Sequence, residues 1–586
     1  MKTATAQQLE PAYSLYDFYK QAALPDPPAW SADIPLILPE GAQPSEFQVK
    51  NLNHILSNSY WGFLDEPGTG KTLPAQAYSV FMAQHGYRSL LVMPPVLKRQ
   101  YVRSLNNTFP GIDKHVTWHI FEEDPYPAKV SKKRVQELAK AMYKGEKIGK
   151  EVPGSILEIV KKLRKSRPIM FSEKEIAAIR ADKTTKQADL AAQYYCSTGA
   201  ISQIKNKVFR EDLIKRWREE NSWPDLLIMS YQLFVKEVKN LEPAYSCLMS
   251  DEAHALCHPS SSTYRMTYWF LHQGDKTFLP MTGTPAPNVP TDTYGLIKLL
   301  NENAYQNFSE FKAIHVDQYQ VETQDGRRFT VINDYLNLDM MSRALYAKAS
   351  RVTKDQVLKL DKPNIIEEEV QLSKQHLELY RKLIKERVLS TGSEFFTASE
   401  AQTLRQTALK IVLNPDAYTD AKIKDNQIKE WLTEKLDSLG CEHLEKVVVF
   451  AQFNQSVEKL SQWFKHLNPA LVYGKSKTQE NVQKFLTDDS CRLMIAHPKS
   501  GGVGVDQLQT LCRYVIFVEP TSVPGEFTQA LDRLHRRGQQ HAVVCYILRV
   551  ARTTWPKRVD EMRRKMKLLR DVTMDKTALL DELLGK

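Results

Sequence analysis

The chain has 586 residues, of which 42% are hydrophobic and 25% are charged. This composition is typical of folded globular proteins, and the length allows about three or four domains. The sequence lacks an apolar run of about 18 residues and an apolar signal segment at its start, so we expect a cytoplasmic protein without a membrane span. The seven cysteines include no CxxC pair, which argues against a disulfide framework and a zinc site of clustered thiols.

The net charge of +11 is concentrated in one segment. Residues 129–220 carry 23 basic and 12 acidic residues, whereas the rest of the chain has equal numbers of each. A concentrated basic segment is typical of proteins that bind a polyanion, most often nucleic acid. A solvated basic surface without a partner explains the charge equally well.

Two series of short apolar runs predict two parallel β-sheets. Continuous apolar runs, in contrast to alternating ones, suit parallel strands that helices cover on both faces. The predicted fold is therefore α/β with two lobes. The first series is 61–64, 89–93, 225–229, 247–249 and 277–281, and the second is 447–450, 471–473, 493–496, 514–518 and 543–548.

The spacing of these runs predicts the domain organisation. The first forty residues are rich in proline and read as an extended lead-in. The stretch between the two series has helical periodicity with Lys and Arg on one face. We therefore expect a lead-in at 1–40, lobe 1 at 41–300 with a basic helical insertion at 126–220, a helical interlobe region at 301–440, and lobe 2 at 441–586.

A phosphate-binding loop is predicted at residues 65–72, DEPGTGKT, directly after the first apolar run. Gly68 and Gly70, with Thr69 between them, allow the backbone N–H groups to point at phosphate oxygens. Lys71 can then reach the β- and γ-phosphates, and the Thr72 hydroxyl can ligate Mg²⁺. The general pattern has Gly where Asp65 stands.

Asp251 and Glu252 follow the apolar run at 247–249. A carboxylate at the end of a strand can hold Mg²⁺, so Asp251 is the second predicted metal ligand. Glu252 can orient or deprotonate the attacking water. Gln48, upstream of the loop, has an amide that can pair with adenine, although a surface Gln is the usual alternative. ATP and Mg²⁺ are therefore the expected ligands.

The order of these motifs resembles superfamily 2 helicases, and most closely the SNF2-type DNA translocases. The motifs of the first half are DEPGTGKT (65–72), DEAH (251–254) and MTGTPAPN (281–288). Those of the second half are KVVVFAQFNQSVEKL (446–460), GGVGVDQLQ (501–509) and QALDRLHRRGQ (529–539). The resemblance implies two RecA-like lobes with ATP between them, in a compact translocase of the bacterial or phage type that acts in the cytosol.

The resemblance also implies roles for individual residues. Arg533 and Arg536 would reach across from lobe 2 as arginine fingers, which contribute about 10³–10⁵ in rate in well-studied NTPases. Gln529 would help to sense the γ-phosphate. The residues that would couple the ATP site to the nucleic-acid track are His254, Thr282, Gly283, Thr284, Gly504 and Asp506.

The segment 172–206, within the basic insertion, resembles a helix-turn-helix. Its recognition helix would start near Thr198 and present polar side chains to a major groove. A helical hairpin that merely decorates lobe 1 is the alternative. The run KKLRKSR at 161–167 reads as a phosphate-binding stretch or as a solvated helix face. The predicted DNA contacts are Lys161, Lys162, Arg164, Lys165, Arg167, Thr198, Ser202, Gln203, Lys205 and Asn206.

Three functions remain open at this point. The first is an ATPase that translocates on double-stranded DNA. The second is a helicase that separates DNA strands or acts on RNA. The third is a DNA-binding regulator with an inactive ATPase, and the presence of every ATP motif argues against it. The biological pathway, polarity, sequence preference and oligomeric state do not follow from the sequence.

Overall fold

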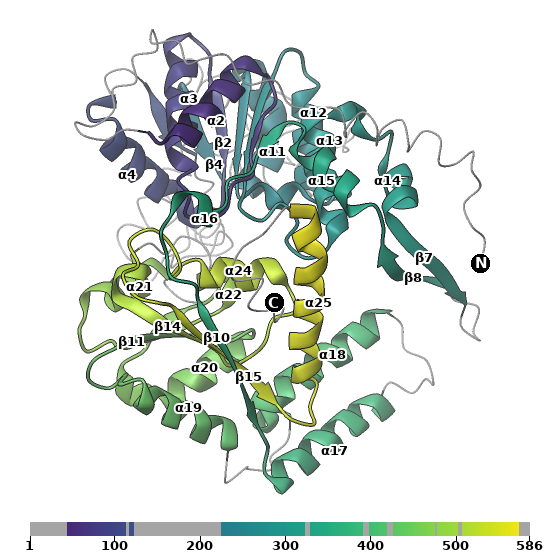
Figure 1. Ribbon diagram of the computed structural model, residues 1–586, viewed down its shortest axis with the longest axis vertical. Helices are drawn as coiled ribbons and strands as arrows, with labels where there is room; N and C mark the ends of the chain where they lie inside the picture. Colours follow the sequence, from purple (N-terminus) through teal and green to yellow (C-terminus); the bar gives the residue numbers. More distant parts are fainter. Residues whose placement is uncertain are drawn as a thin grey trace, which may run out of the picture.

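The computed structural model describes residues 44–112, 116–121, 224–322, 328–390, 398–418, 426–474, 478–501 and 507–573. No helix in these ranges is long and apolar enough to cross a membrane. The described residues form two lobes, one above the other in Figure 1, and each lobe is built on a sheet flanked by helices. The predicted α/β fold with two parallel sheets is confirmed.

Lobe 1 contains a seven-stranded parallel sheet with the strand order β3-β4-β2-β5-β6-β1-β9. Its strands are β1 (Gly62–Phe63), β2 (Ser89–Val92), β3 (Trp118–Ile120), β4 (Leu226–Met229), β5 (Cys247–Asp251), β6 (Thr277–Met281) and β9 (Ala349–Ser350). Its helices are α2 (Glu46–Ser57), α3 (Thr72–Gln84), α4 (Lys98–Thr108), α11 (Tyr231–Leu241), α12 (Ser262–Leu271), α13 (Thr293–Leu300), α14 (Phe308–His315) and α15 (Leu338–Tyr346).

Strand β2 shows why these strands read as continuous apolar runs. Leu90 and Val92 belong to the hydrophobic cluster on one face of the sheet, whereas Leu91 belongs to the cluster on the other face. Because successive side chains of a strand point to opposite faces, a sheet covered on both sides needs apolar residues at every position. All four residues of β2 are buried accordingly.

Lobe 2 contains a six-stranded parallel sheet with the strand order β10-β15-β14-β11-β13-β12. Its strands are β10 (Asn364–Val370), β11 (Lys446–Phe450), β12 (Ala470–Val472), β13 (Leu493–Ala496), β14 (Cys512–Phe517) and β15 (Val544–Val550). Its helices are α17 (Lys374–Ser390), α18 (Ala398–Leu413), α19 (Gln427–Ser438), α20 (Asn454–Trp463), α21 (Thr478–Thr487), α22 (Pro498–Gly501), α23 (Leu508–Leu511), α24 (Pro524–Leu531) and α25 (Trp555–Thr573).

The stretch between the lobes contains strands as well as the expected helices. Strand β9 adds an edge to the sheet of lobe 1, and β10 adds an edge to that of lobe 2. A separate antiparallel hairpin is formed by β7 (Val316–Glu322) and β8 (Arg328–Tyr335). The chain then passes from β9 to β10 through the short helix α16 (Lys354–Val357). This interlobe passage brings residues 350–354 to the phosphate loop.

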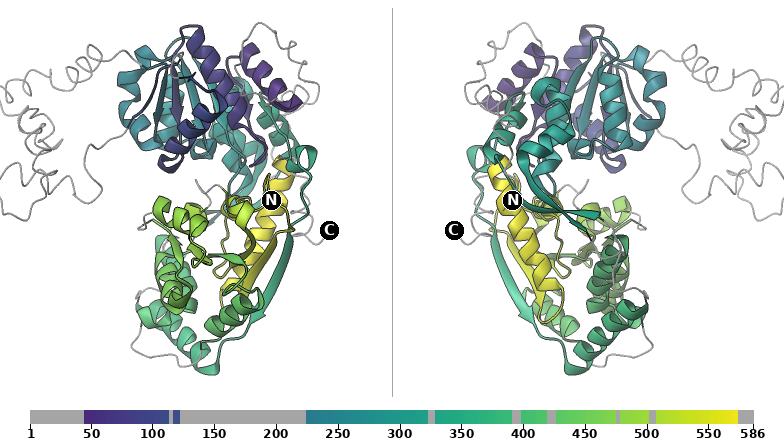
Figure 2. Two further views of the ribbon diagram at one scale, coloured as in Figure 1. Left: turned by 90° about the vertical axis from the view of Figure 1, so that its left-hand side faces the viewer. Right: turned by 90° about the vertical axis from the view of Figure 1, so that its right-hand side faces the viewer.

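The last described helix, α25, packs against both lobes (Figures 1 and 2). Val559, Met562 and Met566 belong to a hydrophobic cluster of lobe 2. Further along the same helix, Val572 belongs to the core of lobe 1. The Tyr346 hydroxyl donates to the carbonyl oxygen of Thr573 at 3.1 Å. Helix α25 therefore ties the two lobes together on one side of the space between them.

Candidate ATP site between the lobes

The phosphate loop lies between β1 and the start of α3, as the sequence predicts for a strand–loop–helix unit. Gly68 and Gly70 have φ of 83° and 104°, in the left-handed region that favours glycine. Lys71 Nζ donates to the carbonyl oxygens of Asp65 and Glu66 at 2.6 and 2.9 Å. Burial lowers the pKa of Lys71, and the nearby charges of Asp65, Glu252 and Asp251 oppose that shift.

Asp65, which stands where the general pattern has Gly, is a buried structural anchor. Its Oδ1 accepts from the Ser350 hydroxyl and from the Val352 backbone N–H, both at 2.9 Å, and its Oδ2 accepts from Asn51 Nδ2 at 2.7 Å. Burial raises the pKa of Asp65, although these hydrogen bonds and the charge of Lys71 counteract it. Asp65 therefore holds the interlobe passage against the loop.

Gln48 contacts the same loop. Its Nε2 donates to the carbonyl oxygen of Gly70 at 2.9 Å, while its Oε1 accepts from the Ser45 N–H and hydroxyl. A Cβ at position 70 would lie 2.8 Å from Gln48 Nε2 and would displace this amide, in addition to the strain that the φ of 104° imposes on any other residue. Gln48 thus supports the loop directly, in addition to the adenine contact predicted for it.

Asp251 ends strand β5, and Glu252 follows it with φ of 52°, which is uncommon for a residue with a side chain. Burial, together with the adjacent Glu252, raises the pKa of Asp251 to about 6. Burial would also raise the pKa of Glu252, but His254, Arg533 and Lys71 outweigh it and lower the value. Glu252 is therefore a carboxylate held in its charged form by cations of both lobes.

The oxygen ligands expected for Mg²⁺ are the Thr72 hydroxyl and the Asp251 carboxylate. Thr72 is the first residue of α3 and directly follows Lys71. The positive charge of Lys71 interacts with the carboxylates of both Asp251 and Glu252. Carboxylate and hydroxyl oxygens suit Mg²⁺, which keeps several waters and shares phosphate oxygens. In the described part of the chain no group of three or more His, Cys, Asp and Glu could hold a metal ion by itself. This donor set fits a magnesium ion that arrives with a nucleotide.

Lobe 2 contributes the two arginines. They follow α24 in the turn after Leu531. A Cβ at Gly68 would lie 3.2 Å from Cβ of Arg536, so Arg536 rests directly over the phosphate loop. Arg533 is close enough to lower the pKa of Glu252. Both side chains have further interactions within the protein. The structure thus brings together the predicted loop, the predicted carboxylates and the predicted fingers from opposite lobes.

A row of polar side chains leads from Glu252 to lobe 2. His254 Nδ1 lies 3.3 Å from Glu252 Oε2 and 3.4 Å from the Thr282 hydroxyl. The Thr282 hydroxyl accepts from the Thr284 N–H at 3.1 Å, and the Thr284 hydroxyl accepts from Gln529 Nε2 at 3.0 Å. Hydrogen bonds therefore connect the predicted coupling residues of lobe 1 to Gln529 of α24.

Gly283 lies between the two threonines of this row. A Cβ at this position would lie 2.5 Å from two carbon atoms of the Pro67 ring, so only glycine fits against the phosphate loop. Backbone contacts join the lobes nearby, where the Gly525 N–H donates to the carbonyl oxygen of Pro287 at 2.8 Å. The row is therefore packed against both the loop and α24.

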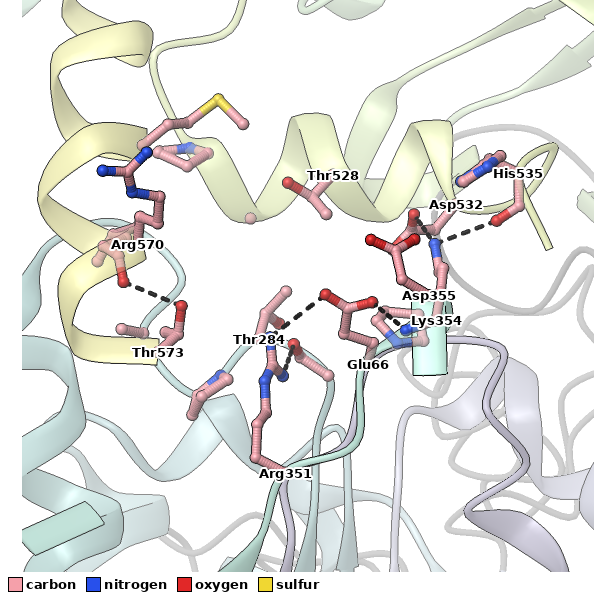
Figure 3. A pocket seen from close by; sticks show the side chains of 18 residues that line it. Glu66, Thr284, Arg351, Lys354, Asp355, Thr528, Asp532, His535, Arg570 and Thr573 are labelled. Carbon is pink, nitrogen blue, oxygen red and sulfur yellow. Dashed lines mark hydrogen bonds and ion pairs between the residues drawn. The ribbon is translucent and has the colours of Figure 1, made fainter. Parts of the chain in front are cut away.

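A small cavity of about 70 Å³ opens beside these contacts (Figure 3). Its walls come from both lobes, the interlobe passage and α25. Figure 3 shows Glu66, Lys354 and Asp532 meeting on one side, with Arg570 on the other. Glu66 and Pro67 of the phosphate loop line it, whereas Lys71 and Asp251 do not, so it adjoins the phosphate site on the side away from these two residues.

The comparisons with known proteins agree with this geometry. Residues 191–420 match the family model of the SNF2-related domain, and residues 430–538 match that of the helicase conserved C-terminal domain. The two matches together cover more than half of the chain. The chain belongs to the SNF2-related proteins. Proteins with these two domains are ATPases of superfamily 2.

Curated SNF2-related proteins are distant relatives of this chain. It is 24% identical to the CHD3-type chromatin-remodeling factor CHR7 of Arabidopsis thaliana, over 61% of this chain and 30% of that protein. It is 21% identical to the SWI/SNF-related matrix-associated actin-dependent regulator of chromatin subfamily A-like protein 1 of Drosophila melanogaster, over 55% of this chain and 41% of that protein. The chain thus spans less than half the length of these relatives.

Among solved structures, the chain resembles the Sulfolobus solfataricus SWI2/SNF2 ATPase core in complex with dsDNA. The TM-score is 0.34 at 16% identity, and the match covers 94% of this chain and 98% of that one.

Several predicted sites of this SNF2-related chain lie outside the described residues. They include the basic insertion with its helix-turn-helix-like segment and all ten predicted DNA contacts, together with Gly504 and Asp506. The match to the SNF2-related domain begins at residue 191, inside that basic segment. The phosphate loop lies before the matched range. Its identification depends on the sequence motif and on the geometry given above.

Proposed function

We propose that this protein is an ATP-driven motor that moves along double-stranded DNA. The observation that carries the proposal is the meeting of the two lobes at one site. Asp251 and Glu252 of lobe 1 face Lys71 of the phosphate loop, and Arg536 of lobe 2 rests on that loop at Gly68. A site that is complete only when two lobes meet converts hydrolysis into relative motion of the lobes.

In this proposal the loop N–H groups and Lys71 bind the phosphates of ATP. Mg²⁺, held by Thr72 and Asp251, would neutralise charge on the β- and γ-phosphates. Glu252 accepts a proton from a water that attacks the γ-phosphorus, while the bond to the β–γ bridging oxygen breaks to give ADP and phosphate. Arg533 and Arg536 stabilise the charge on the transferring group.

Duplex DNA as the track is supported by the charge of the chain and by its relatives. The entire net positive charge is concentrated in residues 129–220, where the helix-turn-helix-like segment offers contacts to phosphates and bases. One of the relatives reported above, CHR7 of Arabidopsis thaliana, is named as a chromatin-remodeling factor. The row from His254 to Gln529 gives a route by which a nucleic acid that changes lobe closure alters the hydrolysis site.

The test is steady-state ATP hydrolysis with Mg²⁺, alone and with duplex DNA, single-stranded DNA or RNA. Lys71→Ala serves as the blank. Stimulation mainly by duplex DNA is expected, followed by displacement of a triplex-forming strand. Stimulation mainly by single strands or RNA would favour a strand-separating helicase. The absence of hydrolysis with every nucleic acid would contradict the proposal.

A further inference from the structure

Lys354 occupies an unusual position between the lobes. It opens the short helix α16 in the interlobe passage. Its ammonium group forms an ion pair with Asp532 of lobe 2 and donates to the carbonyl oxygen of His535 at 3.1 Å. The side chains of Lys354 and Asp532 are only 7% and 4% exposed. This lysine is therefore a buried cation committed to lobe 2 (Figure 3).

The backbone of the same residue is committed to the phosphate loop. The Lys354 N–H donates to Glu66 Oε2 at 2.7 Å. Glu66 Oε1 lies 3.7 Å from Arg351, whose guanidinium also donates to the carbonyl oxygen of Leu64 at 2.7 Å. Glu66 itself lies two residues before Gly68. One residue thus holds the loop through its main chain and lobe 2 through its side chain.

The two groups that Lys354 binds in lobe 2 flank an arginine finger. Asp532 precedes Arg533, and His535 lies between Arg533 and Arg536. Arg536 returns to the phosphate loop at Gly68. The contacts therefore close a ring that runs from the loop through Glu66, Lys354 and the finger-bearing turn back to the loop. Within such a ring, the position of the fingers relative to the loop depends on the lysine.

The ion pair between Lys354 and Asp532 depends on contact between the lobes, because it is buried between them. In the described part of the chain, Asp532 Oδ2 has no hydrogen-bond partner, and Lys354 is the one cation whose ion pair with Asp532 the structure shows. Separation of the lobes would return both charges to water, whereas closure buries them against each other. An ion pair of this kind adds little net stability, but the loss of one partner is costly because it leaves the other charge buried without compensation.

We propose that Lys354 is a positioning residue, which aligns the finger-bearing turn 532–536 with the phosphate loop when the lobes close. The proposal rests on the ATP hydrolysis proposed above. In this proposal Lys354 does not contact the nucleotide. Its backbone N–H donates to Glu66, and its ammonium group contacts Asp532 and His535. Its removal should therefore slow the chemical step and leave nucleotide binding intact.

The test compares Lys354→Met and Lys354→Arg with wild type in DNA-stimulated hydrolysis. For Lys354→Met we expect kcat to fall about 100-fold, the scale of loss for a catalytic group displaced by about 1 Å. The KM for ATP should stay within about threefold. Lys354→Arg keeps the charge and should recover most of kcat. Asp532→Asn, which removes the partner charge, should also lower kcat without raising KM.

The matched control is Lys276→Met. Lys276 Nζ pairs with Glu242 at 2.7 Å inside lobe 1, and the two side chains are 8% and 18% exposed. This variant loses a comparable buried ion pair away from the lobe interface, so it should lower the melting temperature and leave kcat unchanged.

Three results would overturn the inference while the wild type is active. The first is an unchanged kcat in folded Lys354→Met, or in Asp532→Asn if the lysine variant does not fold. The second is an equal loss of kcat in Lys276→Met. The third is a rise in KM with kcat retained. A wild type that hydrolyses no ATP would instead contradict the proposed function, and the inference would fall with it.

Discussion

Both lobes place a carboxylate at the carboxyl end of a central parallel strand. In lobe 1, Asp251 ends β5 and Glu252 follows it. In lobe 2, Glu519 follows β14 by two residues. Burial raises the pKa of Asp251 to about 6 and that of Glu519 to about 7. The carboxyl ends of the strands in both sheets therefore carry a buried carboxylate with a raised pKa.

The partners of these carboxylates differ. Glu519 is used entirely within lobe 2, where it accepts from the backbone N–H groups of Gln452 and Phe453 at 2.8 and 3.1 Å and from the Ser456 hydroxyl at 2.6 Å. It thereby satisfies N–H groups at the start of α20. Asp251 and Glu252 instead face the cations Lys71 and Arg533, which suit a phosphate site, and the imidazole of His254.

The comparison distinguishes a carboxylate that is buried to stabilise the fold from a carboxylate that is buried at a reaction site. A carboxylate that has fixed N–H donors of its own lobe at every side has no site for a metal or a water. A carboxylate pair that faces Lys71 of lobe 1 and Arg533 of lobe 2 lies instead where a phosphate ligand can bind between the lobes. The lobes thus divide the work, since lobe 1 supplies the carboxylates and lobe 2 supplies the arginines.

Replacement of one carboxylate in each lobe gives the sharpest test of this division. Glu252→Gln should reduce ATP hydrolysis about 10²- to 10⁴-fold, the usual contribution of a general base. Nucleotide binding, measured by titration with a fluorescent ATP analogue, should persist. The matched variant Glu519→Gln should keep hydrolysis within about twofold of wild type. Comparable losses in both variants would refute the distinction between the two edges.

A smaller effect is expected where the lobes exchange a hydrogen bond. Thr284→Val removes the hydroxyl that accepts from Gln529 and should lower DNA-stimulated hydrolysis about two- to tenfold, the value of one hydrogen bond. Hydrolysis without DNA should change less. Thr293→Val, which removes a buried hydroxyl bonded to Pro290 within lobe 1, is the control. Equal effects of the two variants on DNA stimulation would exclude a coupling role for Thr284.

The central strands could be predicted from the sequence because burial on both faces imposes apolar residues. All ten apolar runs correspond to strands of the two sheets. Of the four edge strands, β12 was predicted as an apolar run, whereas β3, β9 and β10 were not. Strand β9 has two residues, too few for a pattern, and β10 contains three consecutive glutamates. Two of them, Glu367 and Glu368, pair with Arg549 and Lys435, which only the folded chain brings near.

The same limit applies to the site. Motif spacing identified the loop, the carboxylates and the arginines, because each follows a strand or helix with its own local signal. Asp65 and Lys354 were not recognised as contact residues. Their partners, Ser350 and Asp532, lie 285 and 178 residues away along the chain. A single sequence carries no signal for such pairs, although the Asp at the expected Gly position was the one hint.

The last prediction concerns stability at the lobe 2 edge. The unfolded glutamate has a pKa near 4.5, and the folded value for Glu519 is about 7, so the folded state binds the extra proton between these values. Stability contributed by this group is therefore lost as the pH rises from about 4.5 to 7, by at most about 3 kcal/mol. Glu519→Gln cannot titrate and keeps an amide that can bond to the same groups. As the pH is raised from 5 to 8, the melting temperature of Glu519→Gln should therefore increase relative to that of wild type. If the difference between the two melting temperatures stayed constant over this pH range, Glu519 would be charged in the folded state.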